Sequence, residues 1–427
     1  MQRRMFILFL NLMLVSNILN AQFIELSLFP FLQIKPTFDI NSRSDGMGRL
    51  AFIVDDPIRD VFINPAKSNL IKNNLTILSL SHTLVKNEFE QRLSPSLYNI
   101  THNEQRYTHL SSPIGGIFRL DRFLIGGKIS YQSTEFKSEQ VEEGYQRNVY
   151  KFESKETGYP FAAFMSYEFS DWVSFGLGVD KNTFKEKSTN FVNPDEHSKT
   201  DDLIVRGGLN MKINDVDKLS LLLSFYQSER ELLFFDMTKG WVFQSDYKHK
   251  LNDALLIGGT FTLDKKKMDP YDGYSLKFGV GGIFQSGVIM LASEVSIEPA
   301  WLIYEYKPKE YGSYYQKSKY TFMNWSLKSG VQVNLTDELQ CRFGFEYYKY
   351  QGNYEGKYDT VKYYIKPSHS TFIPTITTGL EYNFDNFNLI YNFNYGSQNH
   401  LLFSGFAGIQ QTDLNPIFNR LMIIYNF

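Results

Sequence analysis

Few residues of this chain have the types and spacing that catalysis requires. His369 and Ser370 are a candidate base and nucleophile of a hydrolase. That chemistry needs the two side chains within hydrogen-bond reach, whereas adjacent residues of a strand point to opposite faces. The acidic pairs Asp55-Asp56 and Asp201-Asp202 are of a kind found in metal and protease sites, but solvated loop acids explain them more simply. We therefore expect no enzyme activity, no metal ion and no cofactor.

The charge balance and the single cysteine exclude further classes of function. The chain has 44 basic and 46 acidic residues and a formal net charge of -2, which gives no electrostatic basis for binding nucleic acid. Cys341 is the only cysteine, so the chain can form neither an internal disulfide nor a cysteine-based metal cluster. The fold must therefore close without covalent cross-links.

The first residues follow the pattern of a secretory signal peptide. Arg3 and Arg4 precede the apolar runs 5–10 and 12–15, and the small residue Ala21 follows. A basic start, a short apolar stretch and a small residue at its end are the parts of such a peptide, and the stretch is too short to span a bilayer as a helix. We predict a signal peptide over residues 1–21; the alternative is an ordinary buried N-terminal helix.

The rest of the chain combines a low mean hydropathy of -0.30 with 16% aromatic residues, and the aromatics recur at every second position. From 386 to 395, five apolar residues alternate with asparagine, broken only by Ile390. From 339 to 347, apolar residues alternate with Gln, Arg, Gly and Glu. A period of two indicates strands, and these segments reach the roughly 9–11 residues that cross a bilayer at a tilt. Similar stripes lie at 123–131, 203–213, 219–225 and 325–335.

Short polar turns and long hydrophilic loops alternate along the chain. This is typical of an outer-membrane barrel whose short turns face the periplasm. The pattern predicts sixteen strands, or fourteen if 240–249 belongs to a loop. The turns lie near 120–121, 170–171, 214–217, 252–253, 286–287, 336–337 and 385–386, and the loops near 86–104, 136–155, 185–199, 232–239, 265–270, 304–317, 352–370 and 398–415.

We therefore predict an all-β fold in which residues 72–427 form a transmembrane antiparallel β-barrel of 14–16 strands, with 16 the best count. In such a barrel the apolar stripes face lipid and their polar neighbours face the lumen. The chain also ends on an alternating strand with the terminal aromatic Phe427, similar to the assembly signal of outer-membrane barrels. The rival fold is a secreted β-sandwich with its stripes packed inward against a second sheet. The lumen candidates are Arg206, Lys212, Arg342 and Glu346.

Residues 22–71 do not alternate, and they include Pro30, Pro36, Pro57 and Pro65, although prolines are rare inside central strands. Within 41–70 lie a Gly-x-Gly-Arg sequence, an Asp-Asp pair, an aromatic residue and Asn-Pro-Ala. This pattern resembles the N-terminal segment of the FadL-type family of outer-membrane transporters and their PorV-type relatives. It departs at Leu50, where the family often has alanine, and at Lys67, where glycine is common. The matching residues are Gly46, Gly48, Arg49, Asp55, Asp56, Phe62, Asn64, Pro65 and Ala66.

The resemblance implies that residues 22–71 fold inward as a plug. Barrels of this size leave a lumen too wide for wall side chains to fill, so water or a plug must occupy it. Gly46 and Gly48 permit tight turns, and Asn64-Pro65 favours an extended or turn conformation before the first strand. We expect Arg49, Asp55 and Asp56 to pair with charges of the lumen, such as the four candidates. A purely structural clip without a transport role remains the alternative for this motif.

The resemblance further implies passive transport of a hydrophobic or amphipathic small molecule, with the plug as gate. Outer-membrane lipids and such a ligand are then the partners, and we expect a largely apolar pocket between plug and wall. The alternative is a non-transporting outer-membrane barrel that acts as a secretion or assembly component. It predicts a closed lumen and a partner-binding patch on the outer loops. The sequence names no cargo.

Overall fold

The structure is a computed structural model. It describes residues 47, 50, 52–92, 100–143, 148–189, 196–232, 235–268, 271–306, 316–358, 361–365, 370–396 and 417–427. The predicted signal peptide, and Gly46, Gly48 and Arg49 of the predicted plug, lie outside these residues. None of the helices in the described ranges is long and apolar enough to cross a bilayer.

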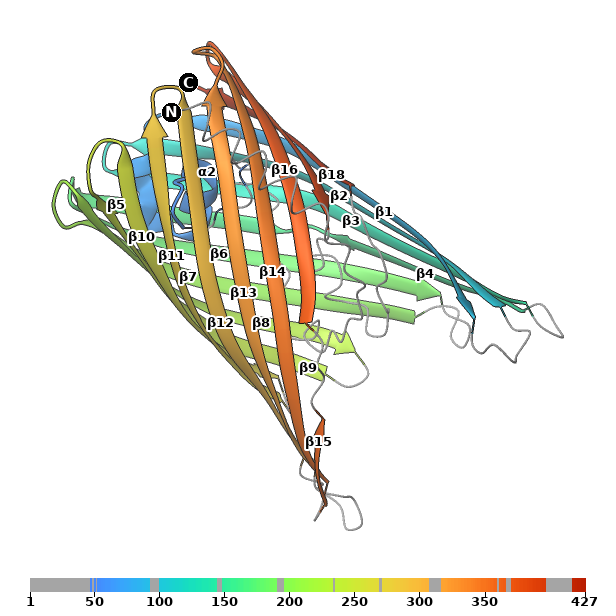
Figure 1. Ribbon diagram of the computed structural model, residues 1–427. Helices are drawn as coiled ribbons and strands as arrows, with labels where there is room; N and C mark the ends of the chain where they lie inside the picture. The colour runs from blue at the N-terminus through green and yellow to red at the C-terminus, as the bar shows by residue number, and fades with distance from the viewer. Residues whose placement is uncertain are drawn as a thin grey trace.

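The described strands form one closed antiparallel barrel (Figure 1). The final strand pairs with the first from Leu75–Asn426 to Leu84–Ile417 and so closes the wall. The strands are β1 (Leu75–Arg92), β2 (Ile100–Leu120), β3 (Phe123–Glu143), β4 (Asn148–Gly158), β5 (Phe161–Ser170), β6 (Val173–Thr189), β7 (Glu196–Lys212), β8 (Asp217–Leu232), β9 (Phe235–Lys250), β10 (Leu255–Met268), β11 (Tyr271–Ser286), β12 (Ile289–Tyr306), β13 (Gln316–Asn334), β14 (Leu339–Tyr358), β15 (Val361–Ile365), β16 (Ser370–Phe384), β17 (Phe387–Gly396) and β18 (Ile417–Asn426).

These segments occupy sixteen positions in the wall. β4 and β5 follow one another between β3 and β6, and β15 and β16 both pair with β14. The predicted count of sixteen is thus confirmed. The stretch 240–249, which the sequence left open between strand and loop, belongs to β9 and pairs with both β8 and β10.

All seven predicted short turns join neighbouring strands. Three of them contain a residue with positive φ, namely Asp121 at 54°, Asp385 at 46° and Gly287 at 56°. Seven of the eight long loops, in contrast, are shorter than predicted, and the eighth, 398–415, lies outside the described residues. β1 continues to Arg92 and β2 begins at Ile100, so most of the expected loop 86–104 is strand.

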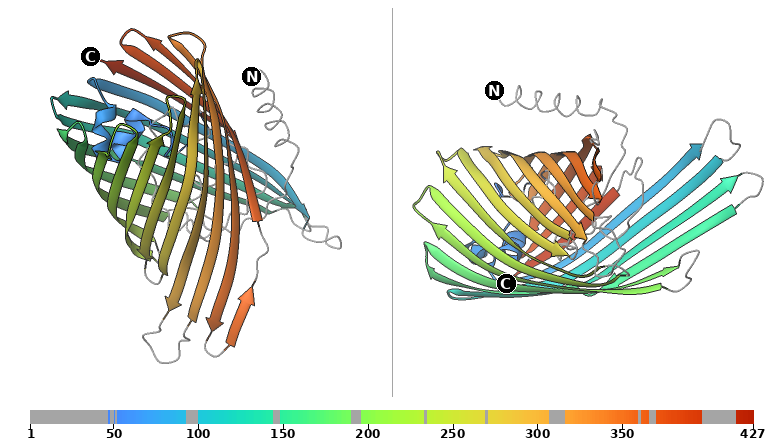
Figure 2. Two further views of the ribbon diagram at one scale, coloured as in Figure 1. Left: turned by 60° about the vertical axis from the view of Figure 1, so that its left-hand side comes forward. Right: turned by 90° about the horizontal axis from the view of Figure 1, so that it is seen from below.

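The error has a physical cause. These stretches are hydrophilic on both faces, and a hydrogen-bonded ladder continues in water as well as in an apolar medium. Hydrophilicity therefore marks where the wall leaves an apolar environment, and it does not mark where the strand ends. In Figure 2 the blue to green strands extend far beyond the red C-terminal strands at the loop end. β2 and β3 have 21 residues each, whereas β17 and β18 have 10.

The wall has an apolar outer face and a mostly polar inner face, with an apolar patch that includes Ile117, Phe164 and Met422 where helix α2 (Pro57–Ile63) packs. On β8, Phe225 is 55% exposed while its neighbour Ser224 is buried; on β14, Phe343 is 47% exposed while Arg342 is fully buried. A water-soluble domain buries its large apolar side chains, and this barrel does the reverse. The stripes point outward, so the predicted barrel is confirmed and the sandwich is wrong.

Two short helices lie inside the barrel near the short-turn end (Figure 1). They are α2 (Pro57–Ile63) and the 3-10 helix η3 (Pro65–Leu70). Asp56 caps α2 by accepting the Arg59 N–H at 3.3 Å, and Pro57 stands at the first turn, where no backbone donor is needed. Asn64 ends α2 and accepts the Ala66 N–H at 3.2 Å to begin η3. We call residues 52–71 the inner segment.

The outward direction of the stripes can be tested by placing a charge on one. Phe225→Arg puts a guanidinium on the apolar outer face and should lower the free energy of unfolding in lipid vesicles by about 2–4 kcal/mol. Phe225→Leu keeps the face apolar and serves as the control. Equal stabilities of the two variants in urea titrations would contradict an outer face that meets hydrocarbon.

Candidate functional site: the inner segment in the lumen

The Asn64-Pro65-Ala66 stretch rests directly on wall glycines. A Cβ on Gly176 of β6 would lie 2.6 Å from the Ala66 nitrogen, and one on Gly208 of β7 would overlap the Asn64 side-chain oxygen. Such distances do not occur between real atoms, so only glycine lets the segment approach this closely. The contact is also hydrogen-bonded, because the Asn64 amide donates to the Leu221 carbonyl at 3.1 Å. Three of the predicted gate residues therefore form a fitted seat against the wall.

The other end of the inner segment is held by a carboxylate. Glu294 of β12 accepts the backbone N–H groups of both Phe52 and Ile53 at 2.8 Å. Hydrogen bonds to an ionised acceptor contribute more than neutral ones, about 1.5–3 kcal/mol each. Met47 packs on the opposite wall against Gly330 of β13. A Cβ on Gly330 would lie 2.7 Å from the Cβ of Met47. Met47 and the inner segment together thus reach from β6 to β13 across the lumen.

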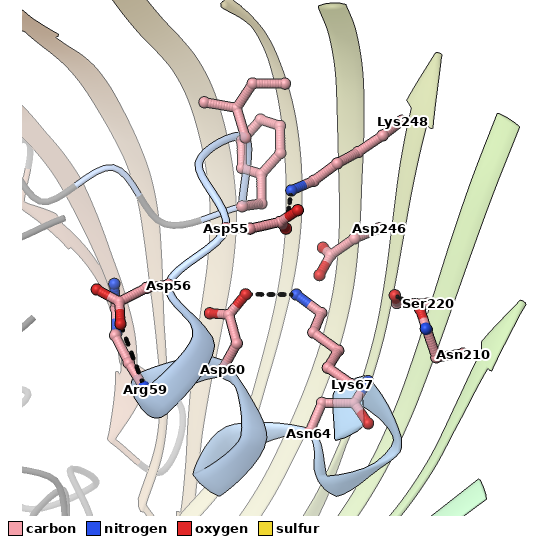
Figure 3. A network of polar contacts seen from close by, with 12 residues as sticks. Asp55, Asp56, Arg59, Asp60, Asn64, Lys67, Asn210, Ser220, Asp246 and Lys248 are labelled. Carbon is pink, nitrogen blue, oxygen red and sulfur yellow. Dashed lines mark hydrogen bonds and ion pairs between the residues drawn. The ribbon is translucent and has the colours of Figure 1, made fainter. Parts of the chain in front are cut away.

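Ion pairs connect the middle of the segment to itself and to the wall (Figure 3). Asp55 contacts the Lys248 ammonium of β9 at 2.5 Å, and Lys67 pairs with Asp60 at 3.1 Å. Burial alone would raise the pKa of the Asp55 carboxyl, but the charges of Lys248 and Lys67 bring it below the ordinary value of 3.8. Burial likewise works against the Lys67 charge, and Asp60 with Asp246 outweighs it and raises the Lys67 pKa. Both shifts favour the charged forms of Asp55 and Lys67 at neutral pH.

An arginine on the wall fixes the point where the inner segment leads into β1. Arg119 of β2 donates to the carbonyls of Ser68 and Ile71 at 2.7 and 2.8 Å. The same guanidinium pairs with Glu168 of β5 at 2.9 Å, and Glu168 in turn accepts the Ser68 hydroxyl at 3.1 Å. One side chain thus satisfies two carbonyls at the end of η3 and ties them to two strands.

The four lumen candidates all lie on the inner face, but three of them pair with the wall. Arg206 donates to both oxygens of Asp180, and Glu346 pairs with Lys328 at 2.9 Å. Arg342 pairs with Glu381 and also donates to Gln332 and Gln340. The fourth, Lys212, lies at the short-turn end and pairs with Asp215 at 2.6 Å. Its ammonium nitrogen also lies 5.1 Å from the centroid of the Trp172 ring.

Asp55 does pair with a charge of the lumen wall, but its partner is Lys248 and not one of the four candidates. Asp56 is used as the helix cap described above. The sequence also gave no prominence to Glu294 or the wall glycines. The only sequence signal for these residues is their place in the period-two pattern, which puts them on the inner face. Glu294, for example, stands between the outward Ser293 and Val295. That signal does not say which inward residues contact the segment.

A cavity of about 140 Å³ lies between the inner segment and strands β8–β11. Its lining is mainly polar and charged, in contrast to the apolar pocket that the sequence led us to expect. Phe52, Ile63 and Leu222 supply its apolar part. The polar part consists of Arg59, Asp60, Asn64, Lys67, Ser220, Gln244, Asp246, Thr260, Thr262 and Lys277.

Within the described ranges, no cluster of three His, Cys, Asp or Glu residues is arranged to hold a metal ion. His369, the candidate base, lies outside them.

No family model and no curated protein matches the chain. Among solved structures, the toluene transporter TodX of Pseudomonas putida is similar with a TM-score of 0.50 and 13% identity, over 90% of this chain and 97% of that one. The toluene transporter TbuX of Ralstonia pickettii gives 0.47 and 10%, over 94% and 100%. A FadL homologue of Pseudomonas aeruginosa gives 0.46 and 12%, over 93% and 99%. At such identities the similarity concerns the fold, and the barrel implied by the resemblance to the FadL type is confirmed.

The seat on β7 offers a matched pair of substitutions. Gly208→Ala places a methyl group onto Asn64 and should cost about 1–3 kcal/mol through overpacking. It should also speed amide hydrogen exchange in peptides that cover residues 64–66. Gly207→Ala points outward, where the nearest atom is 3.8 Å away, and should change neither quantity. Equal exchange in both variants would show that the seat does not hold the segment.

The Asp55–Lys248 pair predicts a specific pH dependence. The folded-state pKa of Asp55 lies below its unfolded value, so its contribution is complete above about pH 4 and disappears as the pH falls through the lowered pKa. The difference in Tm between wild type and Asp55→Asn should be constant from pH 7 to about pH 4.5 and shrink below that. Asp337→Asn, in the exposed turn between β13 and β14, is the control. A difference that already shrinks between pH 7 and 5 would contradict this pair.

Proposed function

We propose that this chain is an integral protein of the bacterial outer membrane that passes a hydrophobic or amphipathic small molecule, with residues 22–71 as its plug. The observation that carries the proposal is the reversed polarity of the barrel. The outer face presents apolar stripes, and the lumen contains the inner segment, which leads into β1 and packs against the wall through non-covalent contacts. This combination suits a barrel whose outer face contacts the hydrocarbon of a membrane and whose lumen is a gated passage. Outer-membrane lipids would then be the first partner of the protein.

The apolar outer face supports the membrane location by its energetics. Contiguous apolar surface costs about 25 cal/mol per Å² in water, and large exposed patches are rare in soluble monomers. Here exposed apolar side chains recur on the strands around the wall, for example Phe175, Phe225, Val280, Trp325, Phe343 and Leu389. An outer membrane removes this cost, and the polar inner face remains hydrated or filled.

The nature of the cargo follows from two observations. Two of the structures similar in fold are named as toluene transporters, which favours an apolar molecule. The cavity beside the inner segment, however, is lined by polar groups, which would suit a polar head group better than a hydrocarbon. Together they favour an amphipathic cargo over a pure hydrocarbon.

The contacts of the inner segment are of a kind that can be released. The segment continues into β1, and from Phe52 to Leu70 ion pairs, hydrogen bonds and apolar packing hold it against the wall. In this proposal Asp55, Asp56, Asn64, Pro65 and Ala66 are the latch. Gly46, Gly48 and Arg49 precede this latch in the sequence and would form the hinge.

One feature favours the second candidate, a non-transporting barrel in a secretion or assembly complex. The close fit of Asn64 and Pro65 to wall glycines is the fit of a permanent brace as much as that of a gate. The two candidates differ in whether molecules cross the barrel.

Transport can be measured directly in proteoliposomes. The full mature chain should take up labelled toluene or a long-chain fatty acid faster than protein-free vesicles, and deletion of residues 22–66 should raise the rate further. Protein-free vesicles correct for direct permeation through lipid. Uptake at the protein-free rate in both forms would exclude transport of these compounds and leave the secretion or assembly role.

A further inference from the structure

A second cavity lies next to the one described above, at the short-turn end of the barrel. Its volume is about 350 Å³, and its lining includes Asp171 and Trp172 of the turn between β5 and β6. On its inner side it reaches Asn69 of the inner segment and Asn210 of β7. The first cavity begins on the next strand, at Ser220 and Leu222 of β8. The two cavities are therefore neighbours along the wall, one at the mouth and one beside the inner segment.

A short chain of polar side chains separates them. The Ser220 hydroxyl donates to the Asn210 side-chain oxygen at 2.7 Å, and the Asn210 amide donates to the Asn69 side-chain oxygen at 3.3 Å. Asn69 and Asn210 line the cavity at the mouth, whereas Ser220 lines the other. Figure 3 shows Asn210 and Ser220 side by side on the wall, facing the inner segment. Both hydrogen bonds of this partition join side chains, and neither involves the backbone of the wall.

The linings of both cavities are polar and nearly balanced in charge. Each has three basic and two acidic residues. At the mouth, Arg119 is neutralised by Glu168 and Lys212 by Asp215; inside, Lys67 is neutralised by Asp60. The sign and polarity of the groups that line a passage determine what crosses it. A nearly balanced polar lining favours a small uncharged solute with several hydroxyl groups over an ion or an apolar molecule.

We infer that small uncharged polyols pass the inner segment along the inner face of β7 and β8, and that the Asn69–Asn210–Ser220 chain is the gate of this passage. A change of rotamer at Asn210 breaks both of its hydrogen bonds and joins the two cavities, without any movement of the inner segment. The inner cavity has room for on the order of ten water molecules, which sets an upper limit near the size of a small sugar alcohol. This polar passage is additional to the proposed amphipathic cargo.

Swelling of proteoliposomes in isosmotic polyols tests the passage with the full mature chain. Asn210→Ala removes the partition and should raise the swelling rate in glycerol several-fold over wild type. Asn210→Leu fills the same space with an apolar group and should reduce it to the protein-free rate. Asn388→Ala, on the inner face of β17 and outside both cavities, is the matched control and should equal wild type.

A disaccharide is the size control, since it is too large for the inner cavity. The inference is overturned if Asn210→Ala does not exceed wild type in glycerol. It is also overturned if the rate rises equally in the disaccharide, because that result reports general loss of the inner segment. Heat-modifiable gel mobility confirms that each variant is folded. Toluene or fatty-acid uptake in the same vesicles reports the proposed function separately, so either result can fail alone.

Discussion

The pairing of β1 with β18 is the constraint on which the rest of the structure depends. In hydrocarbon each unpaired backbone N–H or C=O costs several kcal/mol, so a spanning sheet is stable there only if it has no free edge. The seam is formed by ten consecutive residue pairs, and the ring of the terminal Phe427 lies 6.0 Å from that of Phe118. Closure at sixteen strands then fixes a lumen that wall side chains alone do not fill.

Closure also explains how the charges inside the barrel are used. A buried charge without a partner is far more costly than a buried pair. Several buried charges of the wall form ion pairs with each other. The pairs are Arg206–Asp180, Lys328–Glu346 and Arg342–Glu381. Each pair joins strands that are neighbours in the sheet. Other wall charges, among them Lys248 and Glu294, hold the inner segment instead.

The sequence predicts the wall well because alternation is a local signal. The alternation over 339–347 predicts both the strand and which of its faces points outward. The short turn at 385–386 is likewise predicted from the residues of the turn alone. The strand ends are predicted poorly, since the polar residues of 86–92 continue the ladder of β1. The seat of the inner segment is also beyond local reasoning. Asp55 and Lys248 are 193 positions apart, and Phe52 and Glu294 are 242 apart.

The inner segment is held by different forces at its two ends, which has a consequence for its movement. At the η3 end the fit is steric, because Pro65 and Asn64 occupy the space that side chains at Gly176 and Gly208 would fill. From Phe52 to Asp55, charged contacts with Glu294 and Lys248 add to the apolar packing of Phe52, Ile53 and Val54. Salt and pH act on charges and leave steric fit unchanged. Salt or low pH would therefore weaken the contacts of Glu294 and Lys248 with the Phe52 end, while the steric contacts of Asn64 and Pro65 remain.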